Sequence, residues 1–152
     1  MRAKEMANET VVTISPDRSL ADAAEMMREN HVGDLVVVEE GDDVTKPVGI
    51  ITDRDLVMAI AKFGADKFAG KTVGSKMSDV LLLARNDDPI EDVVRNMRDN
   101  GIRRIPVVDA DGQLSGILTL DDLIGFYGEQ ITALGEIVQT EMSREITGKT
   151  GS

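Results

Sequence analysis

The sequence predicts an α/β (α+β) fold built from two copies of one strand–helix–strand–strand–helix unit, followed by an amphipathic C-terminal helix. Three observations support this prediction: the chain repeats itself, short apolar runs alternate with stretches of helical periodicity, and one apolar stripe from Glu129 onward is left after both copies are complete. A unit of about 60 residues is too small to bury a sufficient core alone. We therefore expect the two copies to pack face to face with pseudo-two-fold symmetry, leaving a cleft along the seam between them.

The repeat becomes visible when the sequence is shifted by 70 positions, which aligns residues 20–38 with residues 90–108. When three loop residues are dropped, Gly-Ile-Ile-Thr-Asp-Arg-Asp at 49–55 aligns with Gly-Ile-Leu-Thr-Leu-Asp-Asp at 116–122. The predicted organisation is a first repeat over residues 1–62, a linker over 63–72, a second repeat over 73–128, and a helix with a polar tail over 129–152.

Each copy predicts the same order of elements. Ser19 precedes the first helical stripe as its N-cap, while in the second copy we expect Asp88 as the N-cap and Pro89 as the first helical residue. Asn30 and Asn100 end these helices, and Leu56 and Leu123 each lie in a second helix. The predicted strands are residues 11–14, 35–38 and 48–51 in the first copy and residues 81–84, 105–108 and 114–118 in the second.

Composition excludes several classes of function. The net charge of −11 opposes binding to nucleic acid or to an anionic membrane surface. The absence of cysteine excludes disulfides and thiolate chemistry, and a single histidine, His31, excludes a multi-histidine metal site. No apolar run approaches the roughly 18 residues of a membrane helix, so we expect a soluble, cytoplasmic protein. We identify no catalytic residues and no metal site, and an enzyme is the weakest hypothesis.

The duplicated Gly-Ile-x-Thr-x-x-Asp motif is the sharpest signal, and two interpretations of it stay open. Thr52 with Asp55, and Thr119 with Asp122, stand where a strand ends and a helix begins. One interpretation is a capping box, which contributes about 1 kcal/mol per helix and needs no ligand. The other is a ligand site, because a hydroxyl and a carboxylate at a helix N-terminus can bind a ribose diol while the free amides face a phosphate. The motif glycines would then let a ligand approach the backbone closely.

The arrangement resembles a tandem pair of CBS domains, the Bateman module, as a stand-alone protein. The resemblance covers residues 4–127 and rests on the two Gly-Ile-x-Thr-x-x-Asp motifs, on Ile-Pro-Val-Val-Asp at 105–109, and on Ile-Ser-Pro-Asp at 14–17. It implies that the cleft binds an adenosine-containing ligand: AMP, ADP, ATP, S-adenosylmethionine or NAD(H). It also implies ribose-binding positions at Thr52, Asp55, Thr119 and Asp122, phosphate contacts at Arg103 and Arg104, and residues flanking adenine at Val32 and Ile102.

The two copies are unequal at the implied phosphate positions. Arg103 and Arg104 align with Gly33 and Asp34, so only one arginine pair serves two ribose-type sites. This predicts unequal occupancy, or one site that takes a less anionic ligand. The alternative is that one or both arginines are solvated edge residues that pair with nearby carboxylates.

Two functional hypotheses follow from these features. The first is a non-catalytic regulatory module that binds an adenosine ligand and signals in trans to a protein effector that the sequence does not identify. The second is a ligand-free scaffold or dimerisation protein in which the Thr-x-x-Asp motifs only cap helices. The resemblance also implies a homodimer of such pairs, in which the helix at 129–146 packs either on its own domain or across the dimer.

Overall fold

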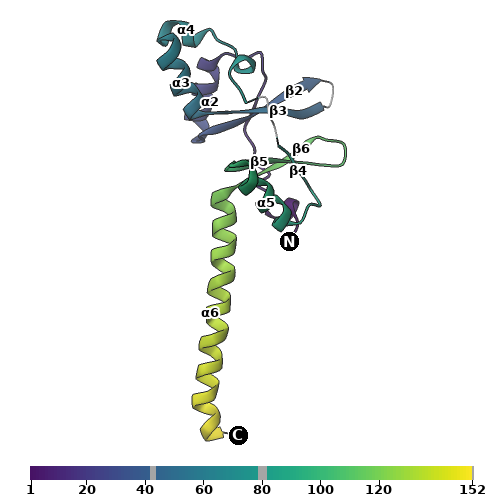
Figure 1. The fold of residues 1–152 in the computed structure, drawn as a ribbon, viewed down its shortest axis with the longest axis vertical. Coiled ribbons are helices and arrows are strands. Elements are labelled where there is room, and N and C mark those ends of the chain that lie inside the picture. The colour runs from purple at the N-terminus through teal and green to yellow at the C-terminus, as the bar shows by residue number, and fades with distance from the viewer. Residues whose placement is uncertain (42–43, 79–81, 152) are drawn as a thin grey trace. The chain divides into compact units, whose positions relative to one another are not determined.

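The computed structural model describes residues 1–41, 44–78 and 82–151 (Figure 1). They form two compact units, the first over Met1–Leu118 and the second beginning at Thr119. In chain order the elements are α1 (Ala3–Met6), β1 (Thr13–Ile14), α2 (Leu20–Asn30), β2 (Asp34–Gly41), β3 (Val44–Thr52), α3 (Asp53–Phe63), α4 (Ala65–Ala69), η1 (Val73–Ser75), β4 (Ala84–Arg85), α5 (Ile90–Asn100), β5 (Arg104–Val108), β6 (Leu114–Thr119) and α6 (Leu120–Gly151).

Two three-stranded sheets, ordered β1-β2-β3 and β4-β5-β6, confirm the duplicated fold. In each sheet the short first strand is parallel to the second, with Ile14 opposite Val37 in one and Ala84 opposite Val107 in the other. These pairs are related by the same shift of 70 positions that reveals the repeat in the sequence. In the first sheet β2 is antiparallel to β3, with an irregularity in register at Val37 and Val38.

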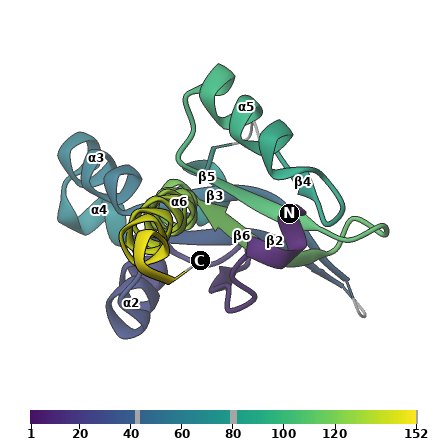
Figure 2. The same cartoon turned by 90° about the horizontal axis from the view of Figure 1, so that it is seen from below.

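The sheets lie between helices in the first unit. Figure 1 shows α2 and α3 on the outer side of the β1-β2-β3 sheet and α5 on the outer side of the other sheet. In the perpendicular view α2 and α5 lie at opposite edges of the overlapping sheets (Figure 2). Each sheet therefore has one face toward helices and one face toward the other sheet.

Local chemistry sets the ends of the two equivalent helices. Ser19 Oγ accepts a hydrogen bond from the backbone N of Asp22 at 3.0 Å and so caps α2, as predicted. In α5 the N-cap is Pro89 rather than Asp88, because the Asp88 carboxylate instead accepts from the backbone N of Arg85 at 2.8 Å. The predicted helix ends at Asn30 and Asn100 are confirmed.

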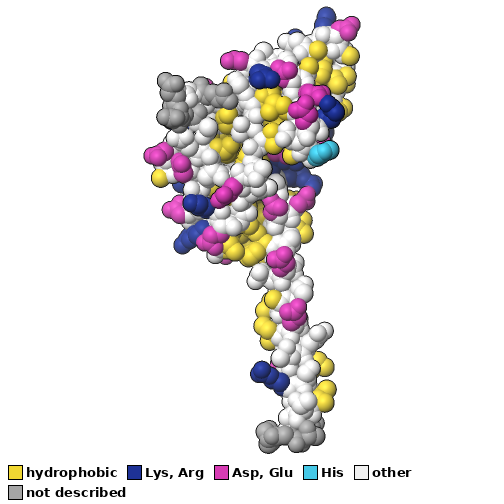
Figure 3. Space-filling view, turned by 180° about the vertical axis from the view of Figure 1, so that it is seen from behind, with side chains coloured by type: hydrophobic (Ala, Val, Ile, Leu, Met, Phe, Trp, Pro, Cys, Tyr) yellow, Lys and Arg dark blue, Asp and Glu magenta, His cyan; other side chains and the backbone are white. Residues whose placement is uncertain are grey.

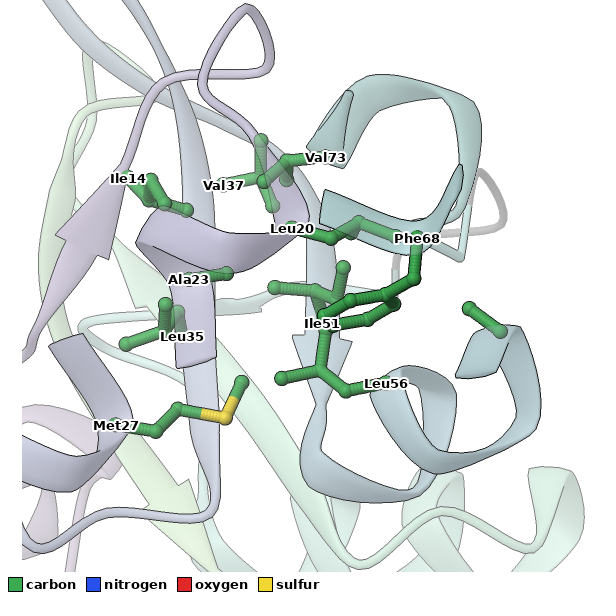
Figure 4. Packing of buried hydrophobic residues seen from close by; sticks show 11 residues of the cluster. Ile14, Leu20, Ala23, Met27, Leu35, Val37, Ile51, Leu56, Phe68 and Val73 are labelled. Carbon is green, nitrogen blue, oxygen red and sulfur yellow. The ribbon is translucent and has the colours of Figure 1, made fainter. Parts of the chain in front are cut away.

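The core of the first repeat lies between its sheet and its helices. Leu20 of α2, Leu35 and Ile51 of the sheet, and Phe68 of α4 point toward one another there (Figure 4). Val73 of η1 joins them with no exposed surface. Residues around the predicted linker are thus an ordered part of the first repeat's core.

A second apolar cluster joins the two sheets. Val36 and Val38 of β2 pack with Ile117 of β6, and Val11 and Leu114 pack against them. Leu35 and Val37 point to the opposite face of the same strand, into the first core. Both faces of β2 are therefore covered, which explains why its apolar run is unbroken.

Each repeat is completed by a segment that lies, in the sequence, directly before the other repeat. Residues 1–8, here the N-terminal arm, contact the second repeat, whereas residues 71–78, here the linking arm, contact the first. Backbone bonds from Ala3 N to Asp88 O (2.9 Å) and from Leu20 N to Lys71 O (2.8 Å) fix the two arms. The isolated bridges are Arg2 with Pro89 and Asn8 with Ile117 for the N-terminal arm, and Ser19 with Thr72 and Ile50 with Ser78 for the linking arm.

Helix α6 is a single helix of 32 residues, about 48 Å long at 1.5 Å per residue. The sequence predicted a second-repeat helix near Leu123 and a separate helix from Glu129, but the helix continues through both. Its described side chains from 128 to 147 are exposed, including the large apolar ones (Figure 3). No helix in the described part of the chain is long and apolar enough to cross a membrane.

Candidate functional site

A pocket of about 280 Å³ lies in the first unit and is lined by residues of both repeats. Its volume is close to the lower end of the range for small-molecule sites. The described lining residues are Ile50, Thr52, Asp55, Ser78, Leu82, Ile102, Arg103 and Arg104.

Five of the eight site residues expected from the sequence meet in this pocket. Thr52 and Asp55 come from the first copy of the motif, whereas Ile102, Arg103 and Arg104 come from the segment that enters β5 in the second repeat. The motif of one repeat is therefore combined with the arginine pair of the other. The sequence did not indicate this pairing, because it depends on how the sheets face each other.

Thr52 and Asp55 form a reciprocal capping box at the start of α3. The backbone N of Asp55 donates to Thr52 Oγ1 at 3.2 Å, and the backbone N of Thr52 donates to Asp55 Oδ2 at 2.9 Å. Each side chain keeps bonding capacity, because the Thr52 hydroxyl can donate its proton and the Asp55 carboxylate has a second oxygen. The capping-box interpretation of the motif is confirmed at this position. The box holds the Thr52 hydroxyl and the Asp55 carboxylate at the pocket, and each group can still form a hydrogen bond to a ligand.

The two arginines have different surroundings. Arg103 is exposed, and no described residue forms an ion pair with it. Arg104 Nε lies 3.5 Å from Asp34 Oδ1, with the Arg104 and Asp34 side chains 32% and 21% exposed. Within the described structure Arg104 Nε is itself buried and makes no hydrogen bond, so the contact with Asp34 is an ion pair alone.

Asp34 is in an unfavourable electrostatic position despite this ion pair. Burial raises the pKa of the Asp34 carboxyl, the Arg104 charge lowers it, and the nearby Asp53 charge raises it further, so that the pKa lies above its ordinary value of 3.8. Desolvation thus outweighs the attraction of Arg104.

The motif glycines make room for the arms. A Cβ placed on Gly49 would lie 2.6 Å from Met77 Sδ and 2.9 Å from the Ser78 carbonyl oxygen. A Cβ on Gly116 would lie 2.9 Å from the Cβ of Ala7 in the N-terminal arm. The chain's own arms therefore take the space that a side chain would fill at these glycines, and the close approach of a ligand to their backbone stays a prediction.

Three lining residues were not expected from the sequence. Ile50 belongs to the Gly-Ile-Ile-Thr motif and could have been found from it. Ser78 reaches the pocket because its backbone N donates to the carbonyl oxygen of Ile50 at 3.1 Å, which is a tertiary contact of the linking arm. Neither Ser78 nor Leu82 lies in a repeated motif, so neither had a signal.

The remaining expected residues lie elsewhere. Val32 is half-buried and packs against the core of the first repeat. Thr119 and Asp122 begin the second unit, where the backbone N of Asp122 donates to Thr119 Oγ1 at 3.2 Å and so caps α6. A second ligand site at these residues stays a prediction. Among the described residues no group of three or more His, Asp or Glu side chains could hold a metal ion.

Residues 3–62 and 72–129 both match the family of the CBS domain. The chain therefore belongs to the CBS domain family and carries two copies of the domain. The CBS domain-containing protein YhcV of Bacillus subtilis is 32% identical over 146 residues, which cover 95% of this chain and 89% of YhcV. Protein MK0525 of Methanopyrus kandleri is 37% identical over 122 residues, which cover 79% of this chain but only 59% of MK0525.

Solved structures of CBS pairs have the same fold. The structure of CBSX2 in complex with AMP has a TM-score of 0.71 and 32% identity, and the match covers 86% of this chain and 98% of CBSX2. The CBS domain pair of protein MJ0100, in complex with 5′-methylthioadenosine and S-adenosyl-L-methionine, has a TM-score of 0.73 and 27% identity, with coverage of 86% and 98%. Both of these relatives were solved with adenosine compounds bound.

Proposed function

We propose that this protein is a non-catalytic regulatory module that binds an adenosine-containing ligand in the described pocket and signals to a partner protein in trans. One observation carries the proposal: the pocket combines the hydroxyl and carboxylate of Thr52 and Asp55 with the guanidinium groups of Arg103 and Arg104. The adenosine compounds bound to CBSX2 and MJ0100 support it. ADP, ATP and NAD(H) are further candidates that contain the same nucleoside.

Each part of such a ligand finds suitable chemistry in the pocket. The free oxygen of Asp55 and the Thr52 hydroxyl suit the two hydroxyls of a ribose. The apolar side chains of Ile50, Leu82 and Ile102 suit an adenine ring. Arg103 suits a phosphate, because guanidinium groups bind phosphate oxygens bidentately.

The proposed regulation follows from the origin of the lining residues. Thr52 and Asp55 belong to one repeat and Arg103 to the other, so a bound ligand favours arrangements in which both repeats present these groups together. A ligand shifts such an equilibrium only by its difference in affinity for the two arrangements. The effector protein would recognise the favoured arrangement.

A ligand-free scaffold is the second candidate, and two observations favour it. The capping box already pairs Thr52 with Asp55, and Arg104 already has Asp34 as a counter-ion. In that case the motif contributes only to stability.

Arg103→Gln separates the two candidates. Arg103 is exposed, so its loss should leave the melting temperature unchanged, while affinity for AMP by calorimetry should fall at least tenfold if a phosphate binds there. The control is Arg98→Gln, which removes an exposed arginine of α5 that pairs with Asp99. Wild-type protein that binds no adenosine compound would reject the proposed function and favour the scaffold.

We also propose a homodimer in which a second copy of the chain covers the apolar stripe of α6. The large apolar side chains of this stripe are spaced by three or four residues, as in a helix–helix interface. The stripe comprises Ile124, Tyr127, Ile131, Leu134, Val138, Met142 and Ile146, which are 39–72% exposed.

A further inference from the structure

The ion pair between Asp34 and Arg104 connects two equivalent positions of the repeat. Asp34 is the first residue of β2 and Arg104 is the first residue of β5. Their side chains meet across the two repeats at 3.5 Å, where Arg104 also lines the pocket. The arginine that would bind a phosphate is thus already occupied by a carboxylate of the other repeat.

The described charges at the pocket do not favour a highly anionic ligand. Three carboxylates lie at or beside the pocket: Asp55 lines it together with Arg103 and Arg104, Asp34 pairs with Arg104, and Asp53 is near Asp34 and acts on its charge. Asp53 is also close to the start of β2, because a Cβ placed on Gly33 would lie 3.0 Å from Asp53 Oδ2. Two positive charges are therefore set against three negative ones.

We propose that Asp34 sets the charge of the ligand by competing with its phosphate for Arg104, so that the pocket prefers an adenosine ligand with at most one phosphate over a triphosphate. This inference rests on the proposed function. A phosphate that takes Arg104 leaves the half-buried Asp34 without its counter-ion, and each further phosphate adds negative charge beside Asp34 and Asp53. A single phosphate can instead use the exposed Arg103 and leave the ion pair intact.

The test compares AMP with ATP by calorimetry in buffer without magnesium. Wild-type protein should bind AMP more tightly than ATP, and Asp34→Asn should raise the affinity for ATP roughly tenfold with a smaller change for AMP. The part of the calorimetric binding signal that is lost in Arg103→Gln is assigned to this pocket. The matched control is Asp92→Asn, which also removes one carboxylate of an ion pair, on the exposed surface of α5.

The outcomes separate this inference from the proposed function. The inference is overturned if wild-type protein binds ATP more tightly than AMP. It is also overturned if the ratio of AMP affinity to ATP affinity in Asp34→Asn lies within twofold of the same ratio in Asp92→Asn. Binding of AMP is retained in both cases, so the proposed function stands. Absence of binding to both nucleotides and to adenosine rejects the function and the inference together. Should Asp34→Asn fail to fold, Asp34→Ser and the wild-type preference provide the same decision.

Discussion

Gly49→Ala tests whether contact with the linking arm is the reason that the motif has glycine at position 49. Glycine weakens a strand interior, so without the arm an added methyl group in β3 should stabilise the protein. With the arm in place the new Cβ would lie 2.6 Å from Met77 Sδ and 2.9 Å from the Ser78 carbonyl oxygen. The Met77 side chain can move, but the Ser78 oxygen belongs to a backbone held by its bond to Ile50.

The expected loss is that of an overpacked site, about 1–3 kcal/mol. For a chain of this length it corresponds to a fall in melting temperature of about 2–12 °C. Because Ser78 lines the pocket, affinity for AMP should fall in the same variant. Thermal unfolding by circular dichroism and calorimetric titration measure the two effects.

Gly70→Ala is the matched control, since nothing lies within 4 Å of a Cβ placed there and the backbone φ of −91° suits alanine. It should leave the melting temperature unchanged or raise it slightly. If Gly49→Ala were as stable as Gly70→Ala, the contact with the linking arm would not constrain the motif, and our account of its glycine would be refuted.

Three further predictions concern the motif, Asp34 and α6. Asp55→Asn keeps an oxygen that can accept from Thr52, so its melting temperature should stay close to wild type while calorimetric affinity for AMP falls at least tenfold; unchanged affinity would mean that Asp55 serves only as a cap. The raised pKa of Asp34 means that its charged form is disfavoured in the folded protein, so Asp34→Asn should melt at a higher temperature than wild type at pH 7. This difference in melting temperature should disappear as the pH falls through the pKa of Asp34 toward 3.8, because both side chains are then neutral. A wild type that is more stable than the variant at pH 7 would contradict this prediction. Leu134→Glu should convert a dimer to a monomer in size-exclusion chromatography with light scattering, whereas Thr140→Glu on the opposite helix face should not; a wild-type monomer would reject the dimer.

The sequence predicts most of the fold because the repeat shows its own symmetry. Helices at 20–30 and 90–100 follow from their apolar spacing and caps, and the buried strands follow from unbroken apolar runs. The N-cap of α5 was misassigned, because the choice between Asp88 and Pro89 depends on a turn in which Asp88 binds the Arg85 backbone. The continuity of α6 was missed because the second repeat is complete before Glu129, and apolar spacing alone does not show whether two successive helical segments are joined.

The site was predictable only in part. The Thr-x-x-Asp motif and the adjacent arginines identified five lining residues, since residue chemistry and position at strand ends are local properties. The pairing of Thr52 with Arg103, the entry of Ser78, and the ion pair of Asp34 with Arg104 arise from contacts between segments far apart in the sequence. Such contacts leave no periodic signal.

The contact of the N-terminal arm with the second repeat has a consequence for folding during synthesis on the ribosome. Asn8 pairs with Ile117, about 110 residues further along the chain. The helix-covered core of the first repeat can form once residue 78 has emerged, but residues 2–4 must wait until residues 86–89 follow, and Asn8 must wait until β6 follows. The N-terminal arm is synthesised first but is among the last segments to form its native contacts, so folding cannot be completed in order from the N-terminus.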